Sequence, residues 1–165
     1  MSEIWITKEA LDLIKHFEGC RLTSYVLPNE TWATIGWGNA IPMSEHPKTI
    51  TQKEADELFL RTVQSRVPVV RSLINDKVEN SLTPLQKAAI LSFNYNTKPQ
   101  SFKTSTFLKL LNSGDIKGAS NQLPRWVRGE GNKVLPGLVR RRKCEKFLMD
   151  GGSWEDLVKK HKFFM

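Results

Sequence analysis

The sequence predicts an α+β fold that is mainly helical, with one small β element in its N-terminal part. Three observations predict it: an amphipathic helical pattern over residues 7–18, strand formers and glycines over residues 20–41, and helical patterns in most of the remaining chain. This order gives an α+β class with a mainly helical C-terminal part. The 165 residues suffice for one domain, which is large enough to form two lobes around a cleft.

The first predicted helix spans residues 7–18. Thr7 is a suitable N-cap, because its side-chain oxygen can accept a hydrogen bond from the first turn. The apolar face follows the helical spacing and consists of Ala10, Leu13, Ile14 and Phe17. Gly19 provides the stop signal, so the helix is expected to end at residue 18.

Residues 20–41 change from a helical to an extended pattern. Residues with high β-propensity fall in this stretch, namely Tyr25, Trp32, Ile35 and Trp37. Pro28-Asn29-Glu30 supplies turn-forming residues between the two extended runs. We therefore expect a hairpin or small sheet that turns at this tripeptide.

Helical patterns dominate the rest of the chain. Thr51 and Glu54 have the spacing of a capping box at the start of the next helix. Pro68 is expected to kink or end that helix, because proline lacks a backbone N–H group. Thr83-Pro84 opens another helix, with proline at the first helical position. Further helices are predicted near residues 104–112, 115–125, 136–149 and 153–160.

The charge balance points to anionic partners. The chain has 25 lysines and arginines against 17 aspartates and glutamates, which gives a formal net charge of +8. Such a protein is attracted to nucleic acid, to anionic membranes or to an acidic cell-wall polymer. Charge alone does not choose among these three, and a basic protein without any such partner has the same composition.

The sequence also excludes several classes of protein. No apolar run approaches the roughly 18 residues of a membrane span. Glu3, Glu9 and Asp12 interrupt the N-terminal region, so we expect no Sec-type signal peptide. The two cysteines, Cys20 and Cys144, are too few for a disulfide scaffold or a four-cysteine zinc site, and we expect free thiols.

Glu18 is the first candidate for chemistry. It stands at the C-terminal end of the predicted first helix, where the negative end of the helix dipole disfavours an ionised carboxylate. A carboxyl group that keeps its proton near neutral pH is what general acid catalysis needs. Considered alone, a solvated surface glutamate is the more common outcome at such a position.

The alternating segment Thr34–Gly38 is the second candidate. Gly36 and Gly38 lack side chains, so a bulky ligand could approach the strand backbone closely. On spacing alone, a bulge or a tight turn is the better explanation of these two glycines.

Taken together, these residues resemble the active-site signature of the phage-type lysozymes, the T4- and P22-like endolysins among the glycoside hydrolases. The signature here runs from Glu18-Gly19 through Tyr25 to the segment Thr34-Ile35-Gly36-Trp37-Gly38. The similarity continues in the correct order through His46–Thr51 with Glu54-Ala55-Asp56, Leu91–Asn96, Arg125-Trp126 and Leu135–Arg142.

The resemblance implies a muramidase that hydrolyses the β-1,4 bond between N-acetylmuramic acid and N-acetylglucosamine in bacterial peptidoglycan. It also implies a small β-containing lobe, a long connecting helix and a helical lobe, with the saccharide cleft between the lobes. We assign these parts to residues 1–50, 51–75 and 76–165. The implied protein is a monomer that needs no cofactor and binds no nucleic acid. It is expected to stay in the host cytoplasm until a holin-type membrane protein releases it to the wall.

The same resemblance implies roles for individual residues. Glu18 is expected to be the general acid, and Thr34 to place the attacking water or the bound sugar across the cleft. One arginine of the basic run at residues 140–143 is expected to face Glu18, and counting back from Trp154 favours Arg141. Supporting and substrate-binding positions are expected at Tyr25, Gly36, Trp37, Asn94 and Trp32. Trp126 is expected in the core of the helical lobe.

One position departs from the family pattern. The family usually carries an aspartate two residues after the tyrosine, where this chain has Leu27, and the loop to Thr34 is about one residue longer. Hydrolysis with two carboxylates needs a second acidic group across the bond. Glu30 lies in the same turn and is a possible substitute, although a solvated glutamate is more common there. Val26-Leu27-Pro28 suggests a packed apolar entry to the turn, so we expect Leu27 to be buried.

Leu27 leaves alternatives open. The enzyme could use a modified arrangement, hydrolyse slowly, act as a lytic transglycosylase, or be a wall-binding relative without activity. A basic nucleic-acid-binding helical domain is a third class, which no specific motif supports. The three histidines, His16, His46 and His161, are far apart in sequence, so we expect no metal site.

Overall fold

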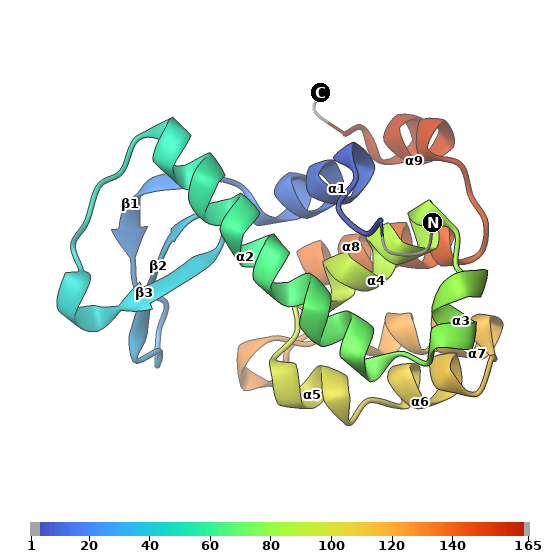
Figure 1. The fold of residues 1–165 in the computed structure, drawn as a ribbon. Coiled ribbons are helices and arrows are strands. Elements are labelled where there is room, and N and C mark those ends of the chain that lie inside the picture. Colours follow the sequence, from blue (N-terminus) through green and yellow to red (C-terminus); the bar gives the residue numbers. More distant parts are fainter. Residues whose placement is uncertain (1–3, 164–165) are drawn as a thin grey trace.

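The computed structural model describes residues 4–163, apart from the side chain of residue 130. The chain begins with α1 (Lys8–Glu18) and a three-stranded antiparallel sheet of β1 (Arg21–Tyr25), β2 (Trp32–Gly36) and β3 (Asn39–Pro42). The long α2 (Gln52–Leu73) then leads to the remaining helices (Figure 1). These are α3 (Asp76–Ser81), α4 (Pro84–Tyr95), α5 (Pro99–Lys103), α6 (Thr106–Asn112), α7 (Ile116–Gln122), α8 (Pro136–Met149) and α9 (Trp154–His161). The predicted fold class is confirmed.

Figure 1 shows the sheet at one end of the molecule and most helices at the other, with α2 running between them. The helix α2 covers most of the range that was expected for a connecting helix. The division of the chain at residues 50 and 75 stays a prediction. None of the helices within residues 4–163 is long and apolar enough to cross a membrane.

The predicted helix starts are confirmed by their capping hydrogen bonds. The side chain of Thr7 accepts a hydrogen bond from the backbone N–H of Ala10. Thr51 forms the expected capping box with Glu54, and Thr83 forms another at the start of α4. Each cap satisfies backbone donors that the first turn leaves free, so local sequence is sufficient to place these helix ends.

The expectation that Pro68 ends this helix was wrong, whereas the expected kink stays a prediction. This proline lies inside α2, which continues to Leu73. A proline inside a helix leaves the backbone carbonyl one turn earlier without its hydrogen-bond partner. Pro68 is exposed, so this carbonyl lies on the solvated side of α2, where water can bind it. Val63 and Val70 are fully buried on the opposite face and hold the helix against the core. The sequence pattern did not predict the short helices α3 and α5.

The sheet follows the predicted hairpin. Tyr25 pairs with Thr34 between β1 and β2, and Trp32 pairs with Pro42 between β2 and β3. The chain turns at Pro28 and Asn29, and Asn29 adopts a positive φ of 65°. Asparagine tolerates this left-handed conformation better than most residues, so the predicted turn has a local cause.

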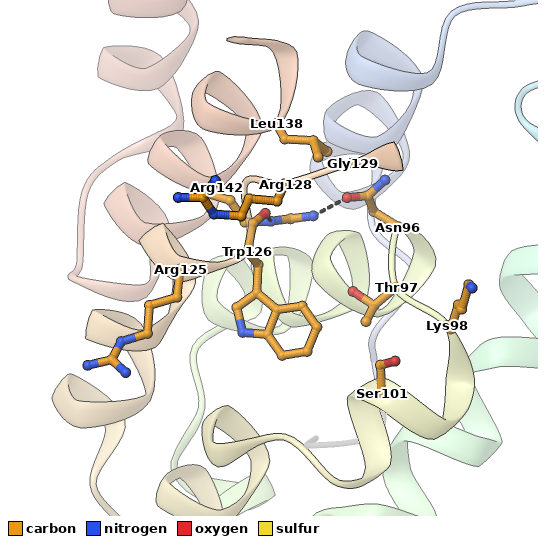
Figure 2. A pocket seen from close by; sticks show the side chains of 10 residues that line it. All are labelled: Asn96, Thr97, Lys98, Ser101, Arg125, Trp126, Arg128, Gly129, Leu138 and Arg142. Atoms are coloured by element: carbon orange, nitrogen blue, oxygen red, sulfur yellow. Dashed lines mark hydrogen bonds between the residues drawn. The ribbon is translucent and has the colours of Figure 1, made fainter. Parts of the chain in front are cut away.

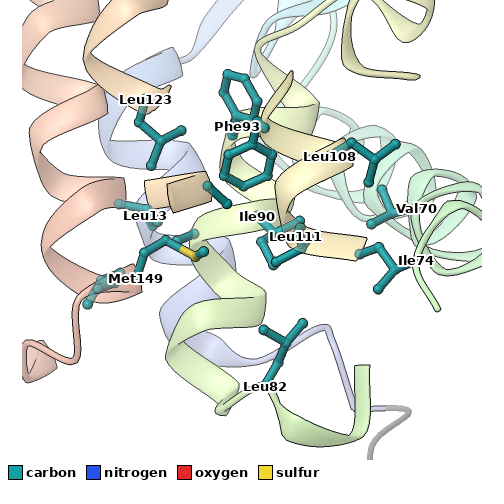
Figure 3. Close-up of a cluster of buried hydrophobic side chains, with 14 of the residues drawn as sticks. Leu13, Val70, Ile74, Leu82, Ile90, Phe93, Leu108, Leu111, Leu123 and Met149 are labelled. Carbon is teal, nitrogen blue, oxygen red and sulfur yellow. The ribbon is translucent and has the colours of Figure 1, made fainter. Parts of the chain in front are cut away.

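The main core surrounds α4. Its residues from Lys87 to Tyr95 are all buried, because α1, α2 and α8 pack on different sides of this helix. Figure 3 shows Ile90 and Phe93 of α4 among side chains from α1, α2, α6 and α8. Trp126 lies edge-on to Phe93 with ring centroids 5.2 Å apart, so it packs against the core of the helical part but is only partly buried. Both cysteine thiols are free.

Candidate active site

Glu18 is the last residue of α1, and its carboxyl group is enclosed from two sides. Arg141 of α8 donates a hydrogen bond from Nη1 to Oε2 over 2.5 Å. The backbone of Gly38, between β2 and β3, approaches the same carboxyl so closely that a Cβ at this position would lie 3.1 Å from Cδ and nearer still to Oε1. The Glu18 side chain nevertheless remains 17% exposed.

Arg141 is a buried cation with several partners. Its side chain is 3% exposed, and its Nε and Nη2 atoms donate to the hydroxyl and the backbone carbonyl of Ser92, over 3.2 and 3.1 Å. In the basic run at residues 140–143, Arg141 and Arg142 point into the protein, whereas Arg140 and Lys143 face the surface. Helical geometry explains this split, because four consecutive residues cover more than one turn.

A cavity of about 530 Å³ opens beside Glu18. It is bordered by the end of α1, by Asn96 after α4 and by the first half of α8. A second cavity of about 360 Å³ shares Asn96 and Leu138 with the first. Figure 2 shows the second cavity, where the guanidinium group of Arg142 reaches Asn96 and the indole ring of Trp126 lies below them. The two cavities together provide an extended surface next to the carboxyl group.

Tyr25 and Thr34 face each other across β1 and β2. Burial raises the pKa of the Tyr25 hydroxyl, the Arg21 guanidinium opposes this, and the negative charges of Glu18 and Glu30 raise it further. Both carboxylates therefore lie within electrostatic range of this hydroxyl. Thr34 is 9% exposed, and Glu30 is half-buried.

The expectation that Leu27 is buried was wrong. Its side chain is 48% exposed, because β1 ends at Tyr25 and the turn carries residues 26–29 into solvent. Trp32, the first residue of β2, is also exposed, at 42%, so a ligand can reach its ring. The Leu27 position therefore contributes no carboxylate to the site.

Three residues that were expected to contact the substrate have partners within the protein. Gly36 is buried where β2 packs against Ala55 of α2, and its φ of +65° is the reason that glycine is favoured there. Asn94 is 4% exposed, and its backbone and side-chain oxygens both accept hydrogen bonds from Arg66. Trp37 is half-buried, and its indole N–H donates to Asp56 over 2.9 Å.

Two residues near the site, Tyr95 and Asn96, were not predicted from the sequence. The hydroxyl of Tyr95 donates a hydrogen bond of 2.7 Å to the backbone carbonyl of Trp37, which directly precedes Gly38. Burial raises the pKa of Tyr95, and the charge of Glu18 raises it further, so Tyr95 lies within electrostatic range of the carboxyl group. Asn96 lines both cavities. The segment Leu91–Asn96 had been recognised as a motif, but it did not show which of its side chains face the site.

Comparisons with known proteins agree with this geometry. The family model for phage lysozyme matches residues 15–145. An endolysin from Acyrthosiphon pisum secondary endosymbiont phage 1 is 38% identical over 148 residues, which cover 88% of this chain and 97% of that protein. The endolysin of Bacillus phage PZA is 36% identical over 90% of this chain, which spans only 56% of that longer protein.

Solved structures give the same result. The muramidase domain of SpmX from Asticaccaulis excentricus has a TM-score of 0.76 and 31% identity, over 87% of this chain and 96% of that one. An endolysin from Escherichia coli O157:H7 phage FAHEc1 has a TM-score of 0.71 and 28% identity, over 87% and 91% of the two chains. The chain therefore belongs to the phage lysozyme family, the glycoside hydrolases that cleave bacterial peptidoglycan.

Proposed function

We propose that this chain cleaves the β-1,4 bond between N-acetylmuramic acid and N-acetylglucosamine, with Glu18 as the general acid. The placement of Glu18 carries the proposal: a carboxyl group at a helix C-terminus borders a cavity large enough for sugar rings. The Arg141 guanidinium and the Gly38 backbone restrict its rotation. A general acid must hold its proton within hydrogen-bond reach of the leaving oxygen, and this restriction provides the required orientation.

Glu30 is the best candidate for the second carboxylate. The usual aspartate position is occupied by the exposed Leu27, whereas Glu30 is half-buried in the same turn. Glu18 and Glu30 both act electrostatically on the Tyr25 hydroxyl at the end of β1. A carboxylate there would stabilise positive charge on the sugar or activate water. Thr34, the register partner of Tyr25, is proposed to position that water or the sugar.

The test of the general acid is Glu18→Gln. The amide has nearly the size of the carboxyl group but cannot donate the catalytic proton, so the clearing rate of outer-membrane-permeabilised Gram-negative cells should fall by roughly 10²–10⁴-fold. The exposed Glu57 on α2 supplies the matched control, and Glu57→Gln should clear cells at the wild-type rate. A Glu18→Gln protein that keeps more than about a tenth of the wild-type rate would exclude the acid role.

Product analysis tests the reaction type. Hydrolysis leaves a free reducing end on N-acetylmuramic acid, whereas transglycosylation leaves a 1,6-anhydro end. Mass spectrometry of the released fragments distinguishes the two, and we expect reducing ends if Glu30 provides the second carboxylate. Glu30→Gln should then lower the rate about as strongly as removal of any positioned catalytic group, by 10²-fold or more. Binding to the wall without clearing would instead indicate a non-catalytic relative.

The biological setting is proposed on the resemblance. We propose that the protein acts as a monomer, stays in the host cytoplasm until a holin-type membrane protein opens the membrane, and then binds the wall with the help of its net charge of +8. Light scattering in solution tests the monomer. Expression with and without a holin tests the release step, because only the combined expression should lyse the cells.

A further inference from the structure

Glu145 is a completely buried carboxylate behind the proposed active site. It lies on α8 with 0% of its side chain exposed. One oxygen contacts the guanidinium group of Arg142, and the other accepts a hydrogen bond of 2.6 Å from Ser92 and lies 3.5 Å from Nε of Arg141. A buried carboxylate is costly unless it is paired and hydrogen-bonded, and both conditions are met here.

The two arginines extend this network to the cavities. Arg141 reaches Glu18 beside the first cavity. Arg142 reaches the side chain of Asn96 and donates to the backbone carbonyl of Trp126 over 2.9 Å, beside the second cavity (Figure 2). Glu145 is thus the carboxylate between two buried cations, each of which fixes a residue that faces a cavity.

We infer that Glu145 is a positioning residue for hydrolysis, which sets both the position of the Arg141 guanidinium and the ability of Glu18 to keep its proton. This inference rests on the proposed acid role of Glu18. Without Glu145, two uncompensated guanidinium groups would face the site, and Arg141 would be free to pair with Glu18 alone. Both changes favour ionised Glu18, which cannot act as a general acid.

The other titratable groups around Glu18 have less influence on whether it keeps its proton. Arg140 of α8 and His16 of α1 line the same cavity, but Arg140 is exposed and therefore screened by solvent, and burial lowers the pKa of His16 and so disfavours its charged form. Tyr25 of β1 and Tyr95 of α4 stay neutral at physiological pH, because burial raises the pKa of both hydroxyls. Glu145 is charged, fully buried and joined to Arg141 both directly and through Ser92, so its charge is the least screened.

The test compares Glu145→Gln with Arg142→Met. Removal of the negative charge should move the basic limb of the pH–rate profile to lower pH by about one unit, and removal of the second positive charge should move it to higher pH. Glu145→Asp keeps the charge and should restore the basic limb towards the wild-type position. A general loss of packing would not shift the profile in opposite directions in the two charge variants.

Glu79 supplies the matched control. It is also a buried glutamate, 3% exposed, with an arginine partner and a second donor: Arg71 Nε and Trp5 Nε1 each lie 2.8 Å from Oε2. Glu79→Gln should lower the melting temperature without moving the pH–rate profile. If Glu145→Gln shifted the profile no more than Glu79→Gln, the positioning role would be refuted.

A second readout separates this inference from the proposed function. The titration midpoint of the Glu18 carboxyl, measured by carbon NMR, does not require turnover. The expected shifts in opposite directions would support the network even if the protein failed to clear cells, in which case only the proposed function would fail. If Glu145→Gln does not fold, Arg142→Met carries the test, and an unshifted midpoint in that variant overturns the inference.

Discussion

Gly38→Ala tests whether the close approach of the β2–β3 connection to Glu18 orders the active site. A Cβ on Gly38 would lie 3.1 Å from Cδ of Glu18 and nearer still to Oε1, so the carboxyl group must move by about 1 Å. Gly38 also has a φ of +77°, a region that costs a residue with a side chain on the order of 1 kcal/mol. A misplacement of about 1 Å in a catalytic group can cost about 10²-fold in rate.

Gly114→Ala separates the two effects. Gly114 has a φ of +86° and nothing within 4 Å of a Cβ, and it lies between α6 and α7, outside the two cavities described. Both variants should therefore lose a similar free energy of unfolding, measured by urea denaturation. Only Gly38→Ala should lose about 10²-fold in the clearing rate of permeabilised cells. A Gly38→Ala protein that keeps half of the wild-type rate, or a Gly114→Ala protein that loses as much activity, would show that this close approach does not order the active site.

Three further variants probe the residues around this site. Arg141→Ala removes the cation that favours ionised Glu18, so the basic limb of the pH–rate profile should move to higher pH. The melting temperature should also fall. An unmoved basic limb would exclude Arg141 from the site. Leu27→Asp should change the free energy of unfolding by less than about 0.5 kcal/mol, because Leu27 is 48% exposed, and a loss of several kcal/mol in urea denaturation would contradict that exposure. Tyr95→Phe removes the hydrogen bond to the Trp37 carbonyl and should lower the free energy of unfolding by about 1 kcal/mol. The clearing rate should also fall, because this hydrogen bond holds the connection that carries Gly38. An unchanged rate would show that the hydrogen bond does not position this connection.

The sequence predicted the local structure well where local chemistry determines it. Thr7, Thr51 and Thr83 each begin a helix, because a cap satisfies backbone donors within the next three residues. The turn at Pro28 and Asn29 likewise depends on conformations that these residue types favour. The order of helices and strands, and hence the fold class, follows from such signals.

Pro68 shows where local signals fail. Proline normally ends a helix, yet the buried Val63 and Val70 hold α2 together while water can satisfy the freed carbonyl on the exposed side. Which side of a helix faces water is decided by the elements that pack against it. The sequence pattern alone does not contain that information.

The active site divides in the same way. The sequence by itself determined that Glu18 ends a helix and that a glycine-containing strand follows, because both depend on nearby residues. Only the tertiary structure decided that Gly38 rather than Gly36 meets Glu18, that Asn94 turns to Arg66, and that Glu145 stands behind Arg141. Neighbouring residues on a helix or strand point in different directions, and packing between elements distant in sequence selects which of them face the cavity.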